Sequence, residues 1–191
     1  MNKSIEMQYN SLQQCKLVDE EETITLTEQL ELKSLHRHRN KEIKIIAITS
    51  AICNSFKNEL LTATHNFTAS TGNTFNIALY TSSATLGAGT TAYNSSYEIT
   101  NSSGSAYSAK GKALTNITPS LDGSTACVDF DDISWTSASF TANGCLIFND
   151  TATGDPAVCA VAFGGDKTVS SGTFTVQFPA KAATTAIVRI A

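Results

Sequence analysis

Charged residues, prolines and long apolar runs are all scarce in this sequence. Aspartate, glutamate, lysine and arginine make up 16% of its 191 residues, against roughly a quarter in ordinary soluble domains. The formal net charge is −4, which argues against a basic nucleic-acid-binding domain. No run approaches the roughly 18 apolar residues that a membrane-spanning helix needs. Hydrophobic residues nevertheless reach 41%, which indicates a folded domain with a buried core and excludes a wholly disordered chain.

Cysteine pairs of the C-x-x-C type are absent, and the number of cysteines is odd. The first 45 residues also lack the apolar core and the small-residue cleavage site of a secretory signal, so we do not expect a disulfide framework. Three cysteines fall within apolar, strand-like runs. We predict that these three, Cys127, Cys145 and Cys159, are buried free thiols.

Histidines and acidic residues do not gather into a recognisable metal or catalytic site. His36 and His38 stand among basic residues whose charge would repel a metal ion, and His65 is expected at the C-terminal end of a helix. Asp129 and Asp131 are expected on the solvent face of a strand. A paired-carboxylate glycosidase stays open in principle, but no phosphate-binding loop or nucleophile elbow occurs. The sequence therefore predicts a non-enzymatic protein with no cofactor and no metal.

Charge is unevenly distributed along the chain. Half of the charged residues lie in the first 45 positions, and serine, threonine, alanine, glycine and asparagine dominate thereafter. We interpret 1–45 as a charged N-terminal arm, either a disordered or helical tail or an upstream extension, and 46–191 as the folded domain. Within the arm, residues 23–35 fit both a strand and a helix pattern.

The domain begins with a helical pattern and continues with short strands. We predict a helix over 51–61, capped by Ser50, with Ile52, Phe56 and Leu60 on its apolar face. Alternating patterns then predict strands at 75–80, 112–118 (closed by Pro119), 126–130, 139–148, 157–163, 173–178 and 186–190. Asn143-Gly144 is either a hairpin turn or a bulge. The fold class predicted is mainly β: an antiparallel β-sandwich or jelly-roll-like domain with one N-terminal helix.

Three tyrosines stand in a polar stretch between the predicted strands. Tyr93, Tyr97 and Tyr107 lie among serine, asparagine and glycine residues, where a ligand-binding loop is often found. Tyrosine rings in such a loop can stack on sugar faces. The alternative interpretation is that the three rings anchor a long loop to the sheet.

Four stretches of the domain resemble a family of small tailed-bacteriophage proteins that are treated as virion components. They are AICNSFK leading into ELL within 51–61, FNIALYTS and ATLG within 75–87, VDF, SW, FTA and LIFN within 128–149, and FGGDK and GTFTVQFP within 163–179. The resemblance covers roughly 46–191, and relatives begin near Ile46, so the arm is an addition. Its motifs are structural, and no catalytic residue is carried over.

The resemblance implies a tail- or capsid-associated structural protein of the virion, assembled in the host cytoplasm. Its partners would be other virion proteins and further copies of itself, with no nucleic acid and no membrane. A host-surface or glycan-binding module that uses Tyr93, Tyr97 and Tyr107 is the alternative. An enzyme such as a depolymerase is the third hypothesis, and it has the least support because no nucleophile or acid pair is recognisable.

Overall fold

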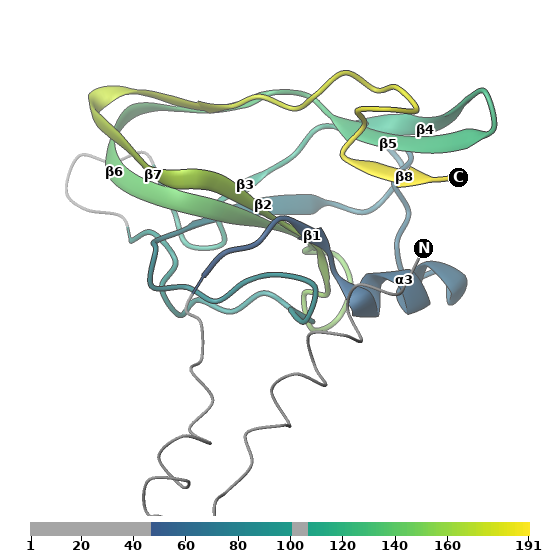
Figure 1. Ribbon diagram of the computed structural model, residues 1–191, viewed down its shortest axis with the longest axis horizontal. Coiled ribbons are helices and arrows are strands. Elements are labelled where there is room, and N and C mark those ends of the chain that lie inside the picture. The colour runs from purple at the N-terminus through teal and green to yellow at the C-terminus, as the bar shows by residue number, and fades with distance from the viewer. Residues whose placement is uncertain (1–46, 101–106) are drawn as a thin grey trace, which may run out of the picture. The chain divides into compact units, whose positions relative to one another are not determined.

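The computed structural model describes residues 47–100 and 107–191, and the charged arm lies outside them. The elements there are one helix and eight strands (Figure 1). In chain order they are β1 (Ala51–Ile52), α3 (Asn54–Leu61), β2 (Phe75–Tyr80), β3 (Lys112–Ala113), β4 (Asn116–Asp122), β5 (Thr125–Phe130), β6 (Ile133–Asn149), β7 (Ala157–Val176) and β8 (Val188–Ile190).

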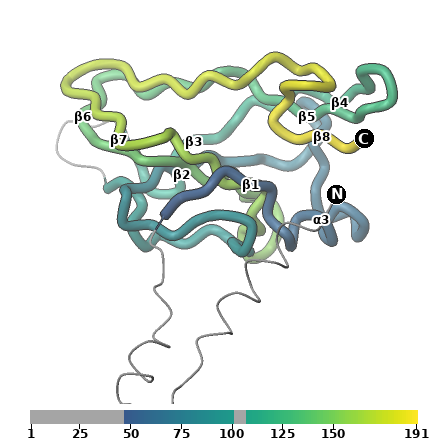
Figure 2. The backbone as a smooth tube through the Cα atoms, viewed as in Figure 1, coloured from purple at the N-terminus to yellow at the C-terminus, as the bar shows by residue number. Residues whose placement is uncertain are grey.

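The strands form two antiparallel sheets. One has five strands in the order β1-β7-β6-β2-β3, and the other has three in the order β4-β5-β8. Figure 2 shows the chain turning back after the end of β7, so that β8 lies beside β5. The predicted class, a mainly β antiparallel fold with one helix, is confirmed, and the two sheets are consistent with a sandwich.

A long bent hairpin of β6 and β7 dominates the larger sheet. The two strands pair from Phe148 and Ala157 at one end to Ile133 and Val176 at the other, and Figure 1 shows the pair folding back on itself. The predicted separation of the strands at 157–163 and 173–178 is therefore wrong, because β7 runs without a break from Ala157 to Val176 and contains the first strand and most of the second. Gly164 and Gly165 adopt positive φ inside a bulge of this strand rather than in a turn.

The bulge also settles the conformation of Asn143-Gly144. Pairing of Gly144 with Ala162 and of Ala142 with Lys167 leaves Asn143 opposite residues 163–166. The Asn143 amide donates to the Asp166 carboxylate at 2.8 Å, which holds the two sides of the bulge together. Of the two predicted alternatives, the dipeptide thus belongs to a bulge and not to a hairpin turn.

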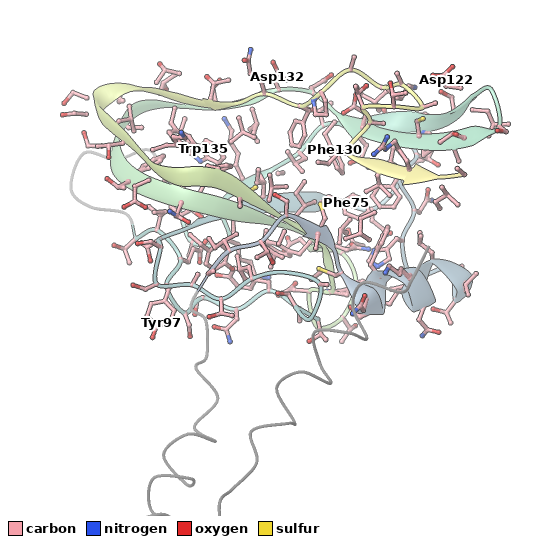
Figure 3. All side chains as sticks on the ribbon, viewed as in Figure 1. Phe75, Tyr97, Asp122, Phe130, Asp132 and Trp135 are labelled. Atoms are coloured by element: carbon pink, nitrogen blue, oxygen red, sulfur yellow. The ribbon has the colours of Figure 1, made fainter. Side chains whose placement is uncertain are left out.

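Aromatic side chains fill the space between the sheets (Figure 3). Phe67 and Phe75 stack with ring centroids 4.3 Å apart, and Phe130 from the smaller sheet packs on Phe75 at 5.8 Å. Trp135, 2% exposed, belongs to a second group near the bend of the hairpin and lies 6.0 Å from the ring of Tyr107. These contacts join residues far apart in sequence and make the two sheets one core.

The helix begins three residues later than predicted. Ala51 and Ile52 pair with Ala160 and Cys159 as strand β1, so α3 begins at Asn54 and its N-cap residue is Cys53. Ser50 does not cap the helix, because its hydroxyl oxygen accepts the backbone N–H of Ala162 at 3.0 Å. Pairing with β7 therefore outweighs the local helical pattern of this segment.

Three smaller predictions also need correction. Pro119 does not close a strand, because β4 runs through it at a sheet edge with a register shift beside it, where proline removes no ladder bond. Asp129 is buried at 5% exposure instead of facing solvent. Its carboxylate accepts the N–H of Phe130 at 2.9 Å, and burial raises its pKa. His65 does not lie at the C-terminal end of the helix, because α3 ends at Leu61 with Thr62 as its C-cap, and the His65 side chain is wholly buried.

Candidate functional site

The structure separates the three tyrosines that the sequence singled out. Tyr107 is fully buried, Tyr93 is partly buried, and Tyr97 is 59% exposed. Figure 3 places Tyr97 on the lower surface, well apart from the buried Trp135. A fully buried ring cannot stack on a sugar, so the three tyrosines do not form one ligand-binding surface.

Two of these tyrosines converge on a buried carboxylate, Glu98. The Tyr93 hydroxyl donates to Oε2 of Glu98 at 2.5 Å, and the Tyr107 hydroxyl donates to Oε1 at 2.8 Å. Burial, reinforced by the hydrogen bond to Glu98, raises the pKa of Tyr93 to about 12. The two rings thus anchor the loop to the sheet, as the alternative interpretation stated. Sequence reasoning missed Glu98, although it is the only acidic residue between Tyr93 and Tyr107.

Tyr107 also completes the hydrogen bonding of β2. Strand β3 pairs only with Asn76 and Ile77, so the outer edge of β2 lacks a strand partner from there on. At Leu79 the backbone N–H donates to the Tyr107 hydroxyl at 2.9 Å, and the carbonyl accepts the N–H of Ile99 at 2.9 Å. A side chain and a loop amide therefore satisfy an edge that would otherwise bury unpaired groups.

A second buried network surrounds Asn149. Its Oδ1 accepts the backbone N–H groups of Thr151 and Ala152, which fixes the orientation of the amide. Its Nδ2 consequently faces Nδ1 of His65 at 3.1 Å and donates to it. Nε2 of His65 then donates to Glu59 at 2.8 Å. Because the His65 ring is packed among phenylalanines with no exposed side-chain surface, this Glu-His-Asn arrangement is structural rather than catalytic.

One lysine ties the loop to the turn after β6. Lys110 lies 2.8 Å from carboxylate oxygens of both Asp150 and Asp155 and 5.7 Å from the ring centre of Tyr93. Hydrogen bonds to the two aspartates, that to Asp150 first, raise its pKa. With both acids engaged by the same lysine, the pair lacks the free acid and base that paired-carboxylate hydrolysis requires.

The smaller sheet leaves apolar side chains uncovered. Leu121, Ala126 and Ile190 are paired across β4, β5 and β8, so their side chains lie in a row on one face. We name these three residues the apolar row. On the same face Val128 and Val188 are buried in the core, whereas Leu121 is 71% and Ile190 54% exposed. The core-facing surface of this sheet therefore continues beyond the core.

A groove of about 580 Å³ opens between the two sheets at β1 and β8. Its walls come from 50–52 and 159–161 on one side and from Thr125, Ala183, Ile187, Arg189 and Ala191 on the other. Asp122 fixes one wall, because its carboxylate accepts the N–H of Ala183 at 2.7 Å. Arg189 contributes the one formally charged side chain among these lining residues and donates to the carbonyl of Ala183 at 3.2 Å.

The remaining chemistry-bearing side chains are engaged in packing. Cys53, Cys127, Cys145 and Cys159 are buried free thiols, which confirms the prediction for the last three. Burial raises the pKa of Cys145 to about 12 and that of Cys159 further, which disfavours the reactive thiolate. Within 47–100 and 107–191, no group of three His, Cys, Asp or Glu residues could hold a metal ion.

Comparisons with known proteins assign no family to the chain. No family model matches it, and neither the curated proteins nor the solved structures give a significant match. In the part of the chain that the structure describes, no helix is long and apolar enough to cross a membrane.

Proposed function

We propose that this chain is a non-enzymatic structural protein of a tailed-phage virion and acts through contacts with neighbouring protein chains. The observation that carries the proposal is the exposure of the apolar row on an otherwise regular sheet. A face that buries Val128 and Val188 and then leaves Leu121 and Ile190 in solvent is typical of a surface that another chain covers.

The hydrogen bonding of the buried polar groups also supports a structural role. Glu98, Asn149 and His65 all serve to hold loops on the larger sheet, and the buried thiols have raised pKa values. A rigid domain with an uncovered apolar face suits a building block that repeats within an assembly. The sequence resemblance adds the virion and its other proteins as the setting.

Quantitative peptide mass spectrometry of purified particles tests this proposal. Particles are isolated from the phage that carries this sequence, and tryptic peptides of 47–191 are counted against an abundant capsid protein. We expect a copy number that matches a capsid or tail symmetry, while a phage replication protein serves as the contamination control. Peptides found in infected cells but not in particles would refute the virion assignment.

A glycan-binding module is the second candidate, and Tyr97 is the observation that favours it. The Tyr97 ring is exposed, and the backbone of this residue has a positive φ of 64°. Its carbonyl accepts both the backbone N–H and the hydroxyl of Thr81, at 3.0 and 3.2 Å. The backbone thus presents one aromatic ring to solvent from a fixed position. Binding on a glycan array that Tyr97→Ala abolishes, while the exposed Leu61→Ala preserves it, would favour this candidate.

A further inference from the structure

The groove beside β8 combines three features that a peptide strand can use. First, β8 is the last strand of its sheet, and its backbone makes no hydrogen bond outside that sheet within the described residues. Its outer edge therefore offers N–H and C=O groups to a further strand. Second, the volume of about 580 Å³ lies within the range of roughly 300–1,000 Å³ that is usual for ligand sites.

The third feature is the pattern of side chains along this wall. Arg189 is the middle residue of β8, and Ile187 and Ala191 flank the strand two residues before and two residues after it. All three line the groove, so they present an apolar, a cationic and an apolar position in turn. No carboxylate among the described residues lies within ion-pair distance of Arg189. An added strand would place its own side chains directly opposite these three positions.

This charge pattern selects the partner. If two copies of the chain paired β8 with β8 about a two-fold axis centred on Arg189, the two guanidinium groups would lie opposite each other. Like charges at paired positions destabilise a sheet. A segment with a carboxylate at that position instead forms a charge-assisted hydrogen bond with the planar guanidinium. The groove therefore favours an acidic strand over self-pairing.

We propose that the groove is a docking site for an extended segment of another protein, which adds to β8 and pairs a carboxylate with Arg189. The segment carries apolar side chains two residues before and two residues after the carboxylate, opposite Ile187 and Ala191. The inference names the chemistry of a partner and rests on the proposed function, in which neighbouring chains contact this domain.

A selection from displayed random nine-residue peptides on the full-length protein tests the site. We expect the wild-type protein to enrich a central Asp or Glu with apolar residues at ±2. The Arg189→Glu variant should enrich a central Lys or Arg instead, because the charge at the wall is reversed. Lys167→Glu makes the same charge change at an exposed position outside the groove and should leave the wild-type preference intact.

A synthetic peptide from the wild-type selection then tests the strand pairing. We expect it to bind about tenfold or more weakly to Arg189→Glu than to wild type, and to lose binding when alternate backbone nitrogens are methylated. Thermal unfolding of Arg189→Glu and Arg189→Gln checks that the variants are folded.

Three results would overturn the docking site. They are no enrichment above empty beads, the same preference in wild type and Arg189→Glu, and binding that survives methylation of each of the two sets of alternate nitrogens in turn. The particle measurement is independent of these results. A chain found in virions without peptide binding would refute this inference and leave the proposed function standing.

Discussion

Removing the hydroxyl of Tyr107 should cost far more stability than its chemical size suggests. The oxygen accepts the N–H of Leu79 and donates to Glu98, and the ring is 0% exposed. Tyr107→Phe keeps the ring but leaves a buried N–H without a partner, which costs roughly 1–3 kcal/mol. It also removes one hydrogen bond to a carboxylate, worth about 1.5–3 kcal/mol. We therefore expect a loss of about 2.5–6 kcal/mol in the free energy of unfolding.

Urea denaturation followed by tryptophan fluorescence suits this measurement. Trp135 is the single tryptophan and lies 6.0 Å from the Tyr107 ring, so its emission reports on this part of the core. Tyr97→Phe is the matched control, because its ring is exposed and the two tyrosine hydroxyls that donate to Glu98 are those of Tyr93 and Tyr107. We expect the control to change stability by less than about 0.5 kcal/mol.

The comparison between the two variants decides the outcome. If Tyr107→Phe costs no more than Tyr97→Phe, the hydroxyl does not complete the edge of β2, and the network around Glu98 is not an anchor. Tyr93→Phe should lower the free energy of unfolding by an amount between those of the other two variants. It removes one donor to Glu98 from a partly buried ring but leaves no backbone group unpaired.

Three further outcomes are expected. In the unfolded chain the thiols of Cys145 and Cys159 lose their protons near pH 9, whereas burial keeps them protonated to higher pH in the folded state. The stability that depends on the protonated thiols is therefore fully present below pH 9. Above it, the free energy of unfolding should fall by about 1.4 kcal/mol per pH unit for each thiol, and urea titrations with constant stability from pH 8 to 11 would contradict this. Nitrogen-15 NMR should find the hydrogen of His65 on Nε2 and none on Nδ1, and the reverse would contradict the Asn149 orientation. Gly144→Ala should cost about 2 kcal/mol or more, since its Cβ would lie 2.5 Å from the Val161 carbonyl oxygen; Gly89→Ala, which meets no atom within 4 Å, is the control in the same unfolding assay.

Strand positions could be predicted where apolar and polar residues alternate and no helical pattern fits the same residues. The pattern Phe75, Ile77, Leu79 gave β2 with its observed bounds, because both faces of that strand are buried. The pattern across 51–61 failed at its first residues, since Ala51 and Ile52 suit a helix locally and pair with β7 more than 100 residues later. Periodicity records which face is apolar, but it does not record which distant strand is available for pairing.

The glycines at 164 and 165 caused a different error, because they predicted a break where the strand continues. Gly164-Gly165 reads as a turn between two strands, yet the register resumes after four residues and the hairpin continues to Val176. A bulge and a turn use the same positive-φ residues. Only the partner strand distinguishes them, because a bulge needs Asn143 on β6 to stay in place opposite the extra residues.

The candidate site was harder to predict because its decisive residues are ordinary in sequence. Glu98 and Asn149 belong to no motif, and their roles come from burial beside groups that need a partner. Arg189 likewise stands in a short C-terminal strand with nothing nearby in the sequence to mark it. The fold places β8 at a sheet edge, sets the Arg189 side chain in the wall of the groove and brings no carboxylate of the described residues within ion-pair distance of it.

The contrast between the buried and the open polar groups separates the groups that hold the fold from those that stay available to a partner. Buried carboxylates and amides such as Glu98 and Asn149 make two or more hydrogen bonds each, so a reactant would have to displace bonds that hold the loops. Arg189 makes one hydrogen bond to a carbonyl from a fork with five donors. Unused donor capacity together with an unpaired strand edge is what a partner can exploit without disturbing the fold, and that combination occurs at the groove.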